Sequence, residues 1–319
     1  MSPKTAIVTG VSSFVGCHLA HTFAMRGWRV VAVVSKPQGD YDGIRAERLT
    51  YIADHVEFAT CDLTNEESVG ALAATHQPDL WIQHAGYATD YASPQYDLEK
   101  SFPLNVLALE PLYKTLAGTK AGVIITGSSM EYASSDQANR EDDVCWPELP
   151  YGVSKLTQTV EASRLARQYG VPTRVVRLYI PVGPFDAPGK LMSYVVEKLL
   201  ANEAADLSPC TQRRDFLGVD DLCEAYVKMT EDFSRQIFDV FNICSGEARE
   251  LKSLLLDFAE IIGANPALLN FNARSMREGE TPVSYGDNDK ARAILDWHPH
   301  NVKDALVQLV ETMRSTEIE

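Results

Sequence analysis

Hydrophobic positions in the first half of the chain form short apolar segments separated by longer segments with helical periodicity. The apolar segments, rich in valine and isoleucine, are 6–10, 29–35, 56–63, 79–86, 122–129 and 173–180. The helical segments are 14–25, 66–76, 98–117 and 151–168. Strands that alternate with helices in this way predict a parallel sheet with helices on both faces. Right-handed crossovers would give an α/β fold with a doubly wound parallel sheet.

The pattern changes near position 181, where Pro- and Gly-containing loops, helices and short strands replace the regular alternation. We expect a larger sheet domain over 1–180 and a smaller C-terminal substrate-binding lobe over 181–319. Segments near 216–245 look like elements that return to the main sheet.

Charge and composition narrow the function classes. The net charge of −15 at pH 7 argues against general binding to nucleic acid or an anionic membrane. No apolar run approaches the roughly 20 residues of a membrane span, and the N-terminus lacks the layout of a signal peptide. The six cysteines are scattered, and His18 and His21 share a helix face without a carboxylate partner. We therefore expect a cytoplasmic protein with reduced thiols and no metal site.

The stretch "TGVSSFVG" joins the first expected strand to the first expected helix. Such a turn brings a strand to a helix N-terminus, where free N–H groups and the helix dipole attract a pyrophosphate. Gly10 permits the tight turn and Gly16 permits close packing, but Ser13 stands where a middle glycine is expected. By itself the stretch also fits an ordinary strand-to-helix turn. With the motifs that follow, it predicts a Rossmann-type dinucleotide site.

The end of the second strand bears on the choice of cofactor. An acidic residue there usually binds the adenine-ribose 2′-hydroxyl of NAD. Here the strand ends with Val34, Ser35 and Lys36. Lys36 and the Ser35 hydroxyl suit a 2′-phosphate, although a solvated surface lysine is the alternative. The sequence therefore favours NADP(H) over NAD(H).

The strongest chemical signal is the pair Tyr151 and Lys155, which lie four positions apart at the start of a helical segment. Residues with this spacing share one helix face. An ammonium group near a phenol favours the phenolate and lowers its pKa, which prepares tyrosine for proton transfer. Ser128 and Ser129 end a strand, at the sheet edge where ligands bind. One of these hydroxyls is expected to hold the substrate oxygen.

Seven motifs appear in the order found in the extended short-chain dehydrogenases/reductases: "TGVSSFVG", "CDL", "QHAG", "LNV", "TGSSMEY", "PYGVSK" and "RRDFLGVDDL". The resemblance covers nearly the whole chain and is greatest to the nucleotide-sugar-modifying branch, particularly the GDP-4-keto-6-deoxy-mannose reductases. It implies an NAD(P)-dependent oxidoreductase with a nucleotide-sugar substrate. It also implies a homodimer formed through the helices 98–117 and 151–168, although both helices would also simply cover the sheet.

Residue roles follow from the same resemblance. Tyr151 would be the acid/base and Lys155 would hold the nicotinamide ribose. Ser128, with Ser129 as the fallback, would bind the reacting oxygen. The expected cofactor-binding residues are Gly10, Ser12, Ser13, Phe14, Val15, Gly16, Ser35, Lys36, Asp62, Leu63, His84, Ala85, Gly86, Asn105, Tyr151 and Lys155. The expected substrate-binding residues are Ser128, Ser129, Met130, Glu131, Arg214 and Arg277.

Two arginines match family positions that bind the nucleotide diphosphate, Arg214 in "RRDF" and Arg277 in "MREGE". The guanidinium fork suits phosphate oxygens. In the alternative, Arg213 and Arg214 pair with Asp215 and Asp220 in a structural network.

The residue at position 130 bears on the reaction. The 4,6-dehydratases of this family have a proton-transferring acid after the catalytic hydroxyl, whereas this chain has Ser129 and Met130. A methionine cannot transfer a proton, and in a strand Glu131 would face the opposite side. We therefore predict reduction of the C4 keto group of an NDP-4-keto-6-deoxy sugar, with Tyr151 as general acid.

Three alternatives stay open. One is an NDP-sugar 4-epimerase that keeps a bound NAD. Another is a reductase of a non-sugar carbonyl compound, which Ile180 favours because a family asparagine that helps hold the sugar diphosphate is missing there. The third is a non-catalytic NADP-binding regulator, against which the complete Ser–Tyr–Lys set argues.

Overall fold

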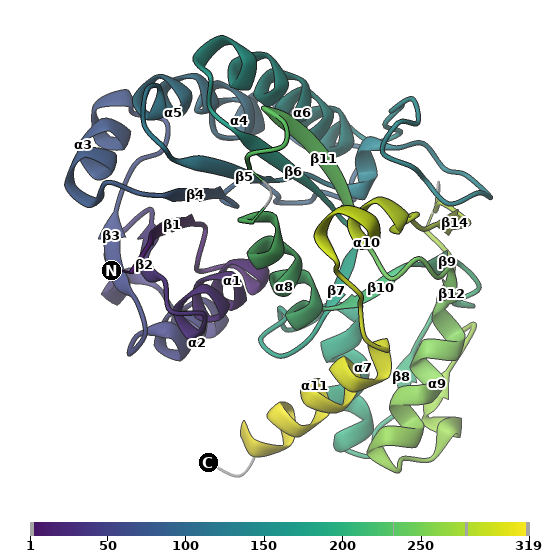
Figure 1. Ribbon diagram of the computed structural model, residues 1–319. Coiled ribbons are helices and arrows are strands. Elements are labelled where there is room, and N and C mark those ends of the chain that lie inside the picture. Colours follow the sequence, from purple (N-terminus) through teal and green to yellow (C-terminus); the bar gives the residue numbers. More distant parts are fainter. Residues whose placement is uncertain (1–2, 232, 278–279, 317–319) are drawn as a thin grey trace.

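A seven-stranded parallel sheet, in the order β11-β6-β5-β4-β1-β2-β3, dominates the part of the chain that the structure describes, residues 3–231, 233–277 and 280–316 (Figure 1). This is a computed structural model. The strands are β1 (Thr5–Thr9), β2 (Arg29–Val34), β3 (Glu57–Thr60), β4 (Leu80–Gln83), β5 (Gly122–Thr126), β6 (Thr173–Leu178) and β11 (Phe238–Ile243). The expected doubly wound sheet is confirmed. Its strand order reverses between β1 and β4, where ligands of such sheets bind.

Helices cover both faces of the sheet (Figure 1). One face carries α1 (Phe14–Met25), α2 (Gly43–Ile52), α8 (Val219–Met229) and α10 (Asp289–Leu295). The other carries α3 (Glu66–His76), α5 (Leu109–Leu116) and α6 (Pro150–Tyr169). In β1, Ala6 and Val8 belong to the first core and Ile7 to the second. Burial on both faces explains why these strands are continuously apolar.

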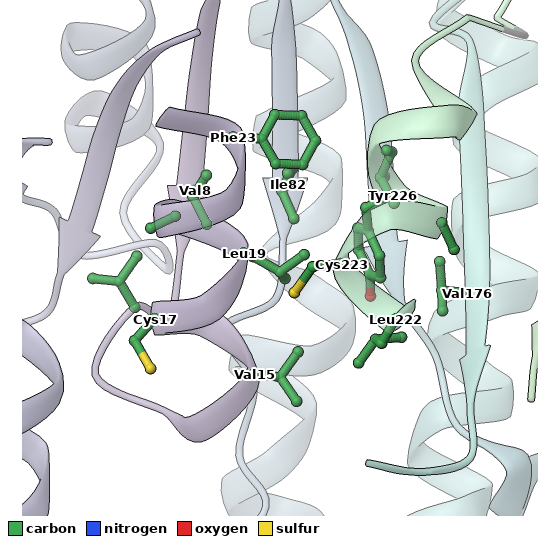
Figure 2. Packing of buried hydrophobic residues seen from close by; sticks show 14 of the residues in the cluster. Val8, Val15, Cys17, Leu19, Phe23, Ile82, Val176, Leu222, Cys223 and Tyr226 are labelled. Atoms are coloured by element: carbon green, nitrogen blue, oxygen red, sulfur yellow. The ribbon is translucent and has the colours of Figure 1, made fainter. Parts of the chain in front are cut away.

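The core between α1 and α8 fixes the helix that begins at the glycine-rich turn. Figure 2 shows side chains of both helices meeting over β1, β4 and β6. The residues are Val8, Val15, Leu19, Phe23, Ile82, Val176, Leu222, Cys223 and Tyr226. Fully burying a side chain of this size stabilises the fold by about 1.5–3 kcal/mol. The turn is therefore anchored by a tightly packed helix.

The expected helix 98–117 is interrupted. The structure has α4 (Leu98–Phe102), a π-helical segment (Pro103–Leu107) and then α5. Pro103 lacks a backbone N–H and cannot make the regular helical hydrogen bond. A single π-helical turn within a helix often marks a functional position. This break was not expected from the sequence.

The remaining elements form the smaller lobe and its connections. Its helices are α7 (Leu191–Leu200), α9 (Leu251–Ile262) and α11 (Val302–Thr316), which share a third apolar core. Its short strands are β8 (Ala205–Asp206), β9 (Arg213–Arg214), β12 (Arg249–Glu250), β13 (Leu269–Asn270) and β14 (Val283–Ser284). Single 3-10 turns occur at Gln38–Asp40, Ser129–Glu131 and Pro266–Leu268.

The segment 216–245 divides between two sheets. β11 pairs with β6 in the main sheet and α8 packs on α1. β10 (Phe216–Gly218) instead pairs with β7 (Ile180–Val182) in a two-stranded sheet. The boundary near residue 180 stays a prediction.

No helix among the described residues is long and apolar enough to cross a membrane.

Candidate active site

The turn after β1 has the geometry of a dinucleotide-binding loop. Gly10 has φ +74°, and a Cβ there would lie 2.8 Å from the backbone N of Ala85. A Cβ on Gly16 would lie 2.1 Å from the carbonyl oxygen of Gly10. The N–H groups of Phe14 and Val15, in the first turn of α1, have no acceptor within the helix. Glycine at both positions therefore allows the turn to pack closely against the start of α1 and the end of β4, and the free N–H groups at this helix N-terminus suit a pyrophosphate.

The Ser13 side chain contacts two groups of the protein. Its Oγ accepts a hydrogen bond from Gly16 N at 3.0 Å and so caps α1. The same Oγ lies 2.8 Å from Nε2 of His84, just after β4. The carbonyl oxygen of Ser12 accepts from Arg48 at 3.1 Å. These bonds hold the turn against the end of β4.

The ends of β2 and β3 place polar groups at the same sheet edge. The Tyr41 hydroxyl lies 3.2 Å from Ser35 Oγ, and the Lys36 ammonium lies 4.7 Å from the Tyr41 ring centre. The sequence did not indicate Tyr41, because only the turn between Ser35 and Tyr41 brings its hydroxyl back to the end of β2. Asp62 is exposed, and hydrogen bonds from the hydroxyl and backbone N–H of Thr64 lower its pKa.

Tyr151 lies among aromatic rings in the first turn of α6. Its ring centre is 5.4 Å from that of Tyr96 and 5.7 Å from that of Tyr91. Burial, followed by the nearby Tyr96, Tyr91 and Glu131, raises the pKa of Tyr151. The phenol therefore keeps its proton at neutral pH, and the same shift makes it a weaker acid than an exposed tyrosine.

Lys155 lies one helical turn after Tyr151 on α6. It is buried, and its ammonium reaches the end of β5. Its Nζ donates to the carbonyl oxygen of Thr126 and to Oε1 of Gln158, each at 2.5 Å. Burial lowers the pKa of Lys155 to about 8, and Glu131 opposes that shift. The Lys155 ammonium is thus directed to Thr126 and Gln158, and its effect on the Tyr151 pKa stays a prediction.

Ser128 begins a 3-10 turn beside Tyr151. Its Oγ accepts from Met130 N at 3.1 Å, which leaves the hydroxyl proton available for another acceptor. A Cβ on Gly152 would lie 2.1 Å from the carbonyl oxygen of Met130. Glycine therefore allows the first turn of α6 to pack directly against the Ser129–Glu131 turn.

Glu131 does not lie where a substrate-binding residue is needed. It is fully buried, and its carboxylate accepts from Ser128 N, Thr159 Oγ1 and Arg177 Nε, each at 3.0 Å. Because residues 129–131 form a 3-10 turn, the side chain turns inward to cap that turn. Burial raises the pKa of Glu131, while the Arg177 charge opposes the shift. The expected contact of Glu131 with substrate is replaced by a structural role.

Asn105 lies in the π-helical segment and is fully buried. Its Oδ1 accepts from Tyr87 N at 2.7 Å, and its Nδ2 donates to Tyr96 Oη at 3.3 Å and to Ser154 Oγ at 3.1 Å. It thus ties the loop that carries Tyr96 to the helix that carries Tyr151. A Cβ on Gly86 would lie 3.0 Å from Asn105 Oδ1, so the backbone at Gly86 also packs closely against Asn105.

The arginines of the smaller lobe have different partners from those considered. Arg214 forms an ion pair with Glu280 at 2.5 Å. Asp215 instead accepts hydrogen bonds from Ser245 and neighbouring backbone N–H groups. The alternative pairing of Arg214 with Asp215 is therefore wrong. Arg277 is exposed, in the segment that leads toward Glu280.

Comparisons with known proteins show the family of this chain. A family model described as the NAD dependent epimerase/dehydratase family matches residues 6–244. The CDP-abequose synthase of Salmonella muenchen is 26% identical over 305 residues, with 92% of each chain covered. The dTDP-4-dehydro-6-deoxyglucose reductase of Escherichia coli is 26% identical over 232 residues, which cover 68% of this chain and 70% of that protein.

A solved structure supports the fold. The UDP-glucose 4-epimerase of Thermotoga maritima, solved with UDP-glucose, matches with a TM-score of 0.82 and 22% identity, covering 98% of this chain and 99% of that one. The expected kinship with nucleotide-sugar-modifying enzymes is confirmed, whereas the closer likeness to GDP-4-keto-6-deoxy-mannose reductases stays a prediction. From the glycine-rich turn to β11, this chain belongs to the NAD dependent epimerase/dehydratase family.

Proposed function

We propose that this protein reduces the C4 keto group of a nucleoside-diphosphate 4-keto-6-deoxy sugar to a hydroxyl group. The observation that carries the proposal is the set of side chains beside Tyr151. Met130 cannot transfer a proton, and the Glu131 carboxylate is buried and bound to Arg177. Elimination of water needs a further acid and base, whereas keto reduction needs one hydride and one proton. The phenol of Tyr151, held between the rings of Tyr96 and Tyr91, provides that proton.

Each residue has a distinct task in this reaction. When bound, the nicotinamide cofactor supplies the hydride to C4. Tyr151 protonates the oxygen as it becomes an alkoxide, and Ser128 donates a hydrogen bond to the same oxygen. Lys155 holds the nicotinamide ribose. Arg214 and Arg277 bind the substrate diphosphate, for which a guanidinium is well shaped.

The relatives support two reaction types. One carries the name of a reductase of a 4-dehydro-6-deoxy sugar, and the structural neighbour is a 4-epimerase. An epimerase retains its cofactor and usually uses NAD, whereas the second strand here ends in Ser35 and Lys36 without the acidic residue that binds the NAD ribose. We therefore place the reductase first and the epimerase second.

The activity is tested with purified protein, NADPH or NADH, and a panel of 4-keto-6-deoxy sugars that differ in the nucleotide. We expect oxidation of one cofactor per sugar reduced. Conversion of an NDP-hexose to its 4-epimer without added reduced cofactor would identify the epimerase. Oxidation only with carbonyl compounds that lack a nucleotide would support the non-sugar reductase. If no compound is turned over, the proposal fails and the regulator remains.

The cofactor is proposed to be NADP(H), with Lys36, Ser35 and Tyr41 around the 2′-phosphate. Lys36→Ala is expected to weaken NADP⁺ binding about 10- to 150-fold, because a charged hydrogen bond contributes about 1.5–3 kcal/mol. NAD⁺ has no phosphate there, so its affinity should change little. Isothermal titration with both dinucleotides measures the ratio. An equal loss for the two would show that Lys36 does not select the cofactor.

A homodimer is proposed through the helical layer that contains α6. Leu107, Val153 and Val160 expose apolar side chains there, with 65%, 39% and 61% of their surface accessible. Val153 and Val160 lie seven positions apart, on one face of α6. This face is suited to a second copy of the chain.

A further inference from the structure

A chain of hydrogen bonds crosses three adjacent strand ends beneath the cofactor turn. It runs from Tyr226 on α8 to Thr126 at the end of β5 (2.7 Å), and from Thr126 to His84 after β4 (2.9 Å). It then passes from His84 to Ser13 after β1 (2.8 Å). Tyr226 is fully buried, and Figure 2 shows it on α8, in the core that α8 shares with α1.

The buried Tyr226 at one end of this series of hydrogen bonds determines which atom is the donor in each of them. Burial raises the pKa of Tyr226, so its hydroxyl keeps a proton. Within the described residues, Thr126 Oγ1 is the acceptor that the structure offers this proton. A buried hydroxyl without an acceptor costs about 1–3 kcal/mol. Tyr226 therefore donates to Thr126, and the Thr126 proton is directed to Nδ1 of His84.

The tautomer of His84 then determines which atom donates to the glycine-rich turn. Burial, with the Lys155 charge adding to it, lowers the pKa of His84 to about 3, so the ring is neutral and carries one proton. Because Nδ1 accepts from Thr126, that proton is on Nε2 and is donated to Ser13 Oγ. With the proton on Nδ1 instead, Thr126 Oγ1 would accept from both His84 and Tyr226, and its own hydroxyl proton would have no acceptor among the described residues.

We propose that His84 is a positioning residue, oriented by Tyr226 through Thr126, that makes the Ser13 hydroxyl an outward-pointing hydrogen-bond donor for a phosphate oxygen of the dinucleotide. Ser13 Oγ accepts from both His84 Nε2 and Gly16 N, so its own O–H is not used in these bonds and can donate to a ligand. It lies at the N-terminus of α1, beside the N–H groups of Phe14 and Val15. The serine thus adds a donor where a glycine offers none. The inference rests on the cofactor site of the proposed function.

The first test needs no variant and no cofactor. Nitrogen-15 NMR of the histidine-labelled, ligand-free protein reports which ring nitrogen of His84 is protonated. We expect a neutral ring with the proton on Nε2 at pH 7. A proton on Nδ1 would reverse the direction of the chain and overturn the proposal.

The second test removes the hydrogen bond between Tyr226 and Thr126, far from the ligand. Tyr226→Phe is expected to mix the two His84 tautomers and to raise the Kd for NADP⁺ and NAD⁺ about threefold to tenfold. Tyr113→Phe is the matched control, because Tyr113 is also fully buried and its hydroxyl bonds one threonine, Thr173, at 2.8 Å. The control should lose comparable stability and leave both the tautomer and the Kd unchanged. Equal effects of the two variants on Kd would contradict the proposal.

Substitutions at Ser13 complete the test. Ser13→Ala is expected to raise the Kd for both dinucleotides about tenfold, and Ser13→Thr, which keeps the hydroxyl, should restore most of the affinity. Unchanged affinity in Ser13→Ala would show that the hydroxyl does not reach the ligand. Failure to reduce any 4-keto sugar would leave these NMR and binding results standing, so the two proposals fail separately.

Discussion

Tyr151→Phe is expected to lower kcat for 4-keto sugar reduction about 10²–10⁴-fold, the usual contribution of a positioned general acid. The substitution removes only the hydroxyl, so the ring still packs against Tyr96 and Tyr91. The site then lacks its proposed proton donor, while Lys155 and the glycine-rich turn, to which the proposed function assigns the cofactor, are unchanged. The loss should therefore fall on kcat, with the cofactor KM within about twofold of its original value. Steady-state kinetics at saturating cofactor measures both.

Tyr91→Phe is the matched control for this change. Its ring lies 5.7 Å from that of Tyr151, and the substitution removes the same atom from a neighbouring ring. It should keep nearly full activity because its hydroxyl has no place in the proposed proton transfer. If Tyr151→Phe retained activity close to that of Tyr91→Phe, another group would have to protonate the sugar oxygen.

Glu131→Ala is expected to cause the largest loss of stability, about 3–5 kcal/mol in the free energy of unfolding. Removing one partner of a buried ion pair leaves the other charge buried without compensation. Here the Arg177 guanidinium would lose its carboxylate, and Ser128 N and Thr159 would lose an acceptor. Such a loss is a large part of the 5–15 kcal/mol that is typical of a folded domain. Urea unfolding followed by circular dichroism measures it.

An exposed ion pair provides the comparison. Glu161 pairs with Arg164 at 2.5 Å on the surface of α6, where solvent screens the attraction. Glu161→Ala should leave the unfolding midpoint almost unchanged. A similar midpoint for Glu131→Ala and Glu161→Ala would show that the buried pair does not stabilise the fold. Glu131→Gln should be intermediate, because its amide oxygen still accepts hydrogen bonds without carrying charge.

The sequence predicts elements well where local signals and packing agree. Helix α1 runs from Phe14 to Met25 as expected, since Ser13 caps it and apolar residues bury its inner face. Helix α3 likewise follows the cap Asn65. The expected helix 98–117 ignored Pro103, which interrupts the backbone hydrogen bonds. Buried residues occur on both sides of that interruption, so the hydrophobic pattern alone does not reveal it.

The site was predictable only as far as its residues lie in local motifs. Tyr151 and Lys155 are one helical turn apart, so their spacing is visible in the sequence. Thr126 contacts His84, 42 positions earlier in the sequence, and Tyr226, 100 positions later. A short motif cannot show contacts over such separations. Glu131 was misplaced because its position was considered on a strand, whereas the chain forms a 3-10 turn there. Contacts between distant segments had to come from the structure.

The π-helical segment Pro103–Leu107 has a consequence for how this family member can vary. A π turn holds one residue more than the α turn it replaces, so every residue after it is rotated by about 100° relative to an uninterrupted helix. Removing one residue would restore a regular helix but turn Asn105 away from Tyr87, Tyr96 and Ser154. Many substitutions at Leu107 would leave this arrangement intact, because its side chain is exposed. The length of this segment, more than its composition, is therefore what natural insertions and deletions must preserve.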